Sequence, residues 1–209
     1  MSSLRNLTDE KLDALRQDIA AKIGDRRFRH TLGVEEAITS LGRLYLPHEL
    51  LRLRVAALLH DVTKEWSEEE QIALCCKENI PISPAEMAAS KVLHAKTGAF
   101  LASRDYSELV DEEIVRAIRE HTVAAPHMST FSALLYLADY IEPTRTYPDC
   151  VALRRAFYDG YCETEKQAHL ARIMIRALEA SVDEVRSRGG VPIKDTEEAL
   201  LYFRSKLEK

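Results

Sequence analysis

Hydrophobic residues recur along the chain at the three- and four-residue spacing of helices that each bury one face. The first such stripe consists of Leu12, Leu15, Ile19 and Ile23, and Thr8 stands before it as a capping residue. No stretch alternates apolar and polar residues over the length of a strand, and no repeat or Ser/Gly linker divides the chain. The pattern therefore predicts a compact all-α domain.

Capping residues and prolines mark where the later helices begin and end. We expect these helices at about 27–46, from Pro47 to Asp61, after the capping pairs Ser67–Glu70 and Ser83–Glu86, around His94, from Asp111 to His121, from Ser129 to Ile141, at about 150–160 and 164–187, and after Asp195. The main domain is expected to occupy residues 1–187, with its core at about 26–145. Residues 188–209 are expected to form a C-terminal tail with a short helix.

The composition is that of an ordinary globular protein, with 209 residues, 46% hydrophobic and 30% charged. A net charge of −5 gives no general reason to expect binding to duplex nucleic acid. The four cysteines have neither zinc-motif nor disulfide-framework spacing, and the charged N-terminus lacks the apolar stretch of a signal peptide. No run approaches the roughly 20 apolar residues of a membrane span. We therefore expect a cytoplasmic protein with no membrane or duplex partner.

An imidazole and a carboxylate stand side by side where one apolar run ends. His60 and Asp61 directly follow Val55–Leu59. Burying such polar groups is costly unless something satisfies them, and a metal ion does so. The pair alone is weak evidence, because His-Asp dipeptides occur by chance in many proteins.

Four more polar residues lie inside or at the end of apolar helical patterns, namely His30, His94, His121 and Asp139. A single histidine on an apolar helix face is more often a hydrogen-bonded core residue than a ligand. The whole set, however, has the content of a two-metal hydrolase site, and its donors suit iron, manganese, zinc or nickel.

Asp61 is the natural bridging ligand, because its carboxylate is flanked by histidine and offers one oxygen to each of two ions. We predict that one ion is completed by His30, His60 and Asp139. The other is completed by His94 and His121. Asp61 is accordingly one of the two predicted catalytic residues.

Lys64 is the second predicted catalytic residue, since it stands four residues after His60, where it is a candidate for a phosphate oxygen. Arg145, just past the apolar helix that ends at Ile141, is a further substrate-binding candidate. For both, a solvated surface role is the open alternative. Thr122 and Lys96, which lie beside predicted ligand histidines, complete the substrate-binding candidates, although simple exposure is the stronger reading of Lys96.

The motifs RHTLGV, AALLHDVTK, LHAKTGAFLA, AIREHT and LADYIEPTR resemble those of the HD-domain metal-dependent phosphohydrolases. Within them the chain is most similar to the YqeK family of bacterial symmetrical bis(5′-nucleosyl)-tetraphosphatases. The similarity runs from about residue 7 to 187, and HDVTK followed by ADYIEPTR is specific to that subgroup. The resemblance places the metal ligands at the same six positions.

The resemblance implies an HD-domain helical bundle with a di-metal site in its core. It implies two transition-metal ions, with iron preferred and manganese or another metal left open. The implied reaction cleaves diadenosine tetraphosphate to two ADP, through attack by a hydroxide that bridges the ions. The alternatives are a phosphatase or phosphodiesterase acting on another nucleotide, and a non-catalytic nucleotide-binding regulatory module. Whether the protein is a homodimer is left open.

Two departures from the family pattern concern the surroundings of the ligands. The fourth histidine motif usually continues with a threonine and a glycine, where this chain has Val123 and Ala124. The helix before ADYIEP usually carries a lysine where this chain has Ala133. Since no ligand is lost, we expect the departures to reshape the nucleotide pocket and to leave the metal chemistry intact.

Overall fold

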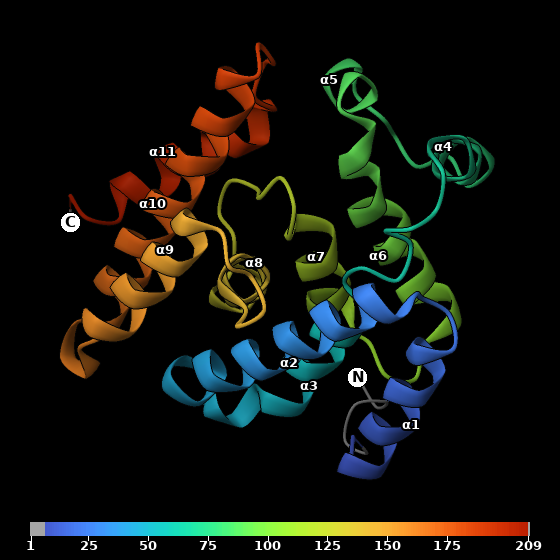
Figure 1. The fold of residues 1–209 in the computed structure, drawn as a ribbon, viewed down its shortest axis with the longest axis horizontal. Coiled ribbons are helices and arrows are strands. Elements are labelled where there is room, and N and C mark those ends of the chain that lie inside the picture. The colour runs from blue at the N-terminus through green and yellow to red at the C-terminus, as the bar shows by residue number, and fades with distance from the viewer. Residues whose placement is uncertain (1–6, 209) are drawn as a thin grey trace.

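The computed structural model describes residues 7–208, and all regular secondary structure in this range is helical (Figure 1). The predicted all-α class is confirmed. Short 3-10 turns lie at Pro47–Glu49, Ser90–Val92 and Glu163–Glu165. The α-helices are α1 (Asp9–Ala20), α2 (Asp25–Tyr45), α3 (Leu50–Leu59), α4 (Glu68–Lys77), α5 (Pro84–Ala88), α6 (Leu93–Asp105), α7 (Glu112–Glu120), α8 (Thr130–Ile141), α9 (Pro148–Asp159), α10 (Lys166–Ser187) and α11 (Lys194–Ser205).

The caps that the sequence predicts are present at the helix starts. Thr8 accepts a hydrogen bond from a main-chain N–H in the first turn of α1. Ser67 with Glu70 and Ser83 with Glu86 form reciprocal capping boxes before α4 and α5. These contacts satisfy N–H groups that lack partners within the helix, which is why the boundaries were readable in the sequence.

Three boundaries differ from the sequence-based expectation. Pro47 begins a 3-10 turn, and the α-helix itself starts at Leu50. Ile23 lies beyond the end of α1, yet its side chain is buried with the rest of that stripe. The last helix begins at Lys194 and runs for 12 residues, so Asp195 lies inside its first turn and does not precede it. Its carboxylate there complements the helix dipole.

α8 is the central helix of the fold. It contacts α2, α3, α7, α9 and α10, and Figure 1 shows it nearly end-on between α7 and the α9–α11 group. All of its residues from Phe131 to Ala138 are buried, as expected for a helix that is apolar on every side. At 12 residues it is far too short for a bilayer, and no helix within residues 7–208 is long and apolar enough to span one.

α11 packs along α10 at the edge of the molecule (Figure 1). Its Ala199 and Phe203 are buried and belong to the same hydrophobic cluster as the residues of α8. The predicted tail is therefore a packed helix. The proposed domain boundary at residue 187 stays a prediction.

Candidate metal centre

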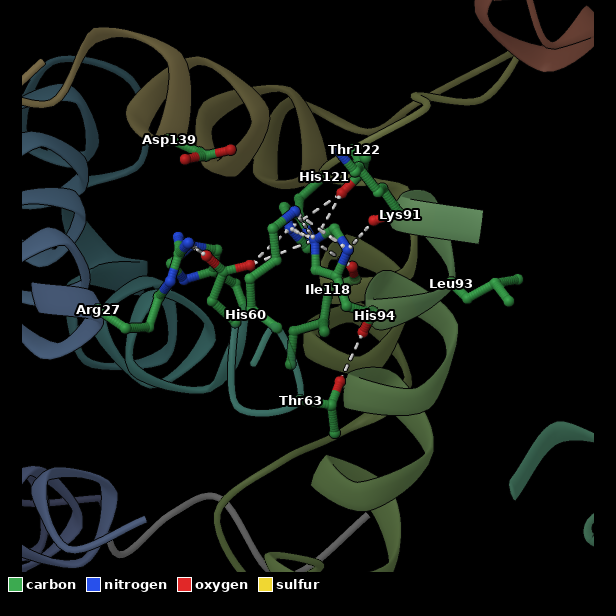
Figure 2. Close-up of polar contacts among 12 residues, drawn as sticks. Arg27, His60, Thr63, Lys91, Leu93, His94, Ile118, His121, Thr122 and Asp139 are labelled. Atoms are coloured by element: carbon green, nitrogen blue, oxygen red, sulfur yellow. Dashed lines mark hydrogen bonds and ion pairs between the residues drawn. The ribbon is translucent and has the colours of Figure 1, made fainter. Parts of the chain in front are cut away.

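The predicted ligands meet where five helices approach one another (Figure 2). The first lies in α2, two follow the end of α3, one is at the start of α6, one follows α7 and one is near the end of α8. They are His30, His60, Asp61, His94, His121 and Asp139. Four of these residues are at most 4% exposed although they are polar, namely His60, Asp61, His94 and His121. So many buried polar side chains in one place require a partner that satisfies them.

Asp61 lies between two pairs of histidines. Its Oδ2 is 3.6 Å from His30 Nε2 and 3.5 Å from His60 Nε2. Its Oδ1 is 3.2 Å from His94 Nε2 and 3.5 Å from His121 Nε2. Each carboxylate oxygen thus faces a different pair of imidazoles, which is the arrangement needed to bridge two ions.

Asp139 adds a second carboxylate to the half of the centre that faces Asp61 Oδ2, called here the Oδ2 half; the half that faces Asp61 Oδ1 is the Oδ1 half. Its Oδ1 lies 3.1 Å from His30 Nε2, and donor atoms of His30, His60 and Asp139 all lie within 4.8 Å of one another. Donor atoms around one ion with bonds of about 2.1 Å are roughly 3.0–3.4 Å apart. In the other half, His94 Nε2 is 3.2 Å from His121 Nε2. The spacing therefore fits a pair of transition-metal ions.

The histidine rings are oriented by hydrogen bonds on their far sides. Nδ1 of His60, His94 and His121 donates at 2.6–2.7 Å to the main-chain carbonyl three residues earlier, that of Ala57, Lys91 and Ile118. A protonated Nδ1 leaves the Nε2 lone pair facing the centre, as in most histidine-ligated metal sites. Nε2 of His30 and of His60 is buried without a hydrogen-bond partner. A metal ion would satisfy both atoms.

Glu142 orients His30, a role that the sequence analysis did not identify. His30 Nδ1 lies 3.2 Å from Glu142 Oε1, and Thr144 donates to this carboxylate from both its main-chain N–H and its hydroxyl, each at 2.6 Å. A side chain at Gly33 would collide with Glu142 Oε2, so the glycine makes room for the carboxylate. The only sequence signal was that Glu142 belongs to the ADYIEPTR motif.

Burial and neighbouring charges shift the pKa values of several groups at the centre. Burial by itself lowers the pKa of His30, but the adjacent carboxylates of Asp139 and Glu142 outweigh it and raise that pKa to about 9. Burial raises the pKa of Asp61, but the neighbouring histidines hold it well below its usual range. Burial lowers the pKa of His94 to about 4, so its imidazole is neutral at pH 7. Anionic carboxylates beside a neutral imidazole form a donor set suited to a borderline divalent ion.

Lys64 and Arg145 both reach the centre, from the segments after α3 and α8. Lys64 Nζ lies 3.1 Å from His94 Nε2. An Arg145 Nη2 lies 2.5 Å from Asp139 Oδ1. Neither side chain is a freely solvated surface group, since Lys64 is only partly exposed and Arg145 has 30% of its side chain exposed. Their predicted contact with a substrate phosphate remains a prediction.

Thr122 also lies at the centre, and Lys96 does not. The Thr122 hydroxyl is 3.1 Å from Nε2 of both His94 and His121. Lys96 Nζ instead donates to the Pro81 carbonyl at 2.6 Å and to Glu86 at 2.8 Å, on the far side of α6. The geometry gives no support to Lys96 as a phosphate ligand.

The family departures lie outside the set of ligands, with Val123 and Ala124 directly after Thr122 and with Ala133 in α8. The carbonyl of Val123 accepts a hydrogen bond from the Thr196 hydroxyl of α11 at 2.6 Å. Ala124 is buried with φ 60°, a conformation that favours glycine. Ala133 lines a cavity of about 430 Å³ between α8, α10 and α11. That these residues shape the nucleotide pocket stays a prediction.

The chain is similar in sequence to known proteins. The HD domain model matches residues 27–144. A symmetrical bis(5′-nucleosyl)-tetraphosphatase of Halalkalibacterium halodurans is 30% identical over 66% of this chain and 72% of its own length. That of Bacillus subtilis is 30% identical over 70% of this chain and 75% of its own. The chain belongs to the HD-domain family of symmetrical bis(5′-nucleosyl)-tetraphosphatases.

A solved HD-domain structure has the same overall architecture. It is a predicted HD superfamily hydrolase involved in NAD metabolism from Clostridium acetobutylicum, with a TM-score of 0.81 and 28% sequence identity. The alignment covers 93% of this chain and 97% of that one. The HD-domain fold expected from the sequence is thus confirmed.

Proposed function

We propose that this protein is a symmetrical bis(5′-nucleosyl)-tetraphosphatase, which hydrolyses diadenosine tetraphosphate to two ADP. The observation that carries the proposal is the division of four histidines between the two oxygens of Asp61. A centre of this kind supports in-line displacement at phosphorus. The relatives from Halalkalibacterium halodurans and Bacillus subtilis bear the name of this activity.

The cofactor that we propose is a pair of transition-metal ions, with iron preferred and manganese as the alternative. Four imidazoles and two carboxylates favour such metals over magnesium, which prefers oxygen ligands alone. When bound, the ions would lower the pKa of a water and neutralise phosphate charge. The residues that would hold them are His30, His60 and Asp139 in one half, His94 and His121 in the other, and Asp61 between them.

The remaining residues of the centre supply positive charge and a hydrogen-bond donor for the substrate. Lys64 stands on the Oδ1 side of Asp61 and Arg145 beside Asp139 on the other. Both would stabilise charge that develops on phosphate oxygens during the displacement. The Thr122 hydroxyl lies 3.1 Å from Nε2 of both His94 and His121, the ligand histidines of the Oδ1 half. Because ADP is a good leaving group, the reaction needs no dedicated general acid.

We propose that the protein acts in the cytoplasm and that neither a membrane nor duplex nucleic acid is its partner. The support is the net charge of −5 and the spacing of the four cysteines. The substrate would be a freely diffusing dinucleoside polyphosphate.

The proposed function predicts that diadenosine tetraphosphate yields ADP as the sole nucleotide product. Attack at one of the two central phosphorus atoms gives two ADP, whereas attack at an outer one gives AMP and ATP. Chromatography of the products with iron or manganese present distinguishes these outcomes, and a parallel reaction with chelator is the control. Release of AMP and ATP, or brisk hydrolysis of another nucleotide without cleavage of this one, would overturn the substrate assignment.

A further inference from the structure

A third cationic side chain reaches the centre in addition to Lys64 and Arg145. Arg27 lies in the first turn of α2, and its Nη1 is 2.6 Å from Asp61 Oδ2. Its side chain is 26% exposed, and its Nε is buried without a hydrogen-bond partner. Figure 2 shows Arg27 extending from its helix toward the same space as Asp139 and His60. Among the residues that the structure describes, the Nε–H donor of this guanidinium is therefore unused.

Arg27 is set apart from the arginines beside it. The α2 sequence begins Asp-Arg-Arg-Phe-Arg, and both Arg26 and Arg29 are exposed. Arg27 precedes His30 by three residues, so the two side chains share one face of the helix. The start of this helix is fixed by the Gly24 N–H, which donates to Glu65 at 2.7 Å. Glu65 follows Lys64 directly. This hydrogen bond therefore links the start of the helix that carries Arg27 to the segment that carries Lys64.

The cations are unevenly distributed around Asp61. Arg27 contacts its Oδ2, and Arg145 contacts Asp139, which belongs to the same half of the centre. Lys64 stands alone in the half that contains His94. One half of the centre therefore carries two guanidinium groups and the other a single ammonium.

The charges call for an anion. Arg27, Arg145 and Lys64 together balance the three carboxylates of the centre, those of Asp61, Asp139 and Glu142. Divalent ions bound to the ligand residues would leave a large positive surplus that only a polyanion can match. Guanidinium groups suit phosphate oxygens because their N–H donors form a planar fork. A diphosphate group has the charge and the oxygen atoms to engage two of them.

We propose that Arg27 and Arg145 form a phosphate seat on the Oδ2 side of Asp61, which binds the diphosphate of one nucleoside diphosphate unit. This inference rests on the proposed function. It adds Arg27 as a substrate-binding residue, and it makes the two halves of the centre unequal in how they bind the substrate. One ADP unit is held by two guanidinium groups, and the other lies toward Lys64. The product ADP is therefore expected to bind chiefly at the seat.

Calorimetric titration of ADP into metal-loaded protein tests the seat. Arg27→Gln is expected to weaken ADP binding by about 10-fold or more, the usual effect of losing a charge-assisted hydrogen bond. Arg27→Lys keeps the charge and is expected to restore part of the affinity. Arg26→Gln, the same change at the exposed neighbouring residue, is expected to bind ADP like the wild type. The metal content of every sample is measured alongside, and circular dichroism verifies the fold.

Two results would overturn the seat. Arg27→Gln that binds ADP as tightly as the wild type would show that Arg27 does not touch the diphosphate. Arg27→Gln that loses its metal together with ADP would show that Arg27 acts only by holding Asp61. Hydrolysis of diadenosine tetraphosphate by the wild type is a separate readout. The wild type could fail to cleave diadenosine tetraphosphate while Arg27→Gln, but not Arg26→Gln, weakens ADP binding. In that case the proposed function fails and the phosphate seat stands.

Discussion

Asp61→Asn is expected to lower kcat for diadenosine tetraphosphate by on the order of 10³-fold or more, because mutation of groups that merely support metal ligands already costs 10–100-fold. The amide keeps the size of the side chain but cannot offer an anionic oxygen to each half of the centre. His30 and His60 would lose the charge beside Oδ2, and His94 and His121 the charge beside Oδ1. The variant is therefore also expected to bind less metal.

The fold of this variant should be unaffected, since the packing at the end of α3 rests on Leu58 and Leu59, which are buried. Circular dichroism measures this directly. Asp183→Asn, on an exposed position of α10, is the matched control and is expected to keep wild-type turnover and metal content. Near-wild-type turnover by Asp61→Asn would show that Asp61 is not the bridging ligand.

Lys64→Ala is expected to lower kcat by about 10²-fold, the usual cost of removing a group that stabilises transition-state charge. Its ammonium lies 3.1 Å from His94 Nε2, within the centre. Burial, together with the nearby Arg27 and Arg145, lowers the pKa of this amine, while Asp61 and Asp139 oppose the shift. We expect this amine to meet a phosphate anion of the substrate.

The measurement for Lys64→Ala separates charge stabilisation from metal binding. We expect kcat to fall while the metal content stays close to that of the wild type, because Lys64 is not among the ligand residues. Lys77→Ala, which removes an exposed lysine at the end of α4, is the control. An unchanged kcat in Lys64→Ala would mean that Lys64 takes no part in the reaction.

The sequence alone predicted the fold class and identified the six candidate ligands, because both predictions depend on local patterns. Capping residues mark helix ends wherever they occur. A polar side chain in an apolar stripe points to the core, whatever the tertiary arrangement. His60 and Asp61 were identified in this way, and the structure places them with the four other candidates.

The supporting residues were less predictable, because their roles depend on approach between distant segments. Glu142 meets His30 across 112 positions in the chain, and no helical pattern encodes that contact. Lys96 was a candidate because it stands two residues after His94 in the sequence. Residues two apart on a helix point in different directions, and Lys96 accordingly faces Glu86. Helical spacing could have identified Arg27, three residues before His30.

Metal analysis of the protein purified without chelator tests most directly the claim that Asp61 joins two ion sites. We predict about two transition-metal ions per chain, with iron or manganese restoring activity better than magnesium alone, as expected for ligation by four imidazoles. The chelated protein is expected to be inactive until metal is returned. Protein that contains no tightly bound metal and remains fully active in chelator would contradict the account.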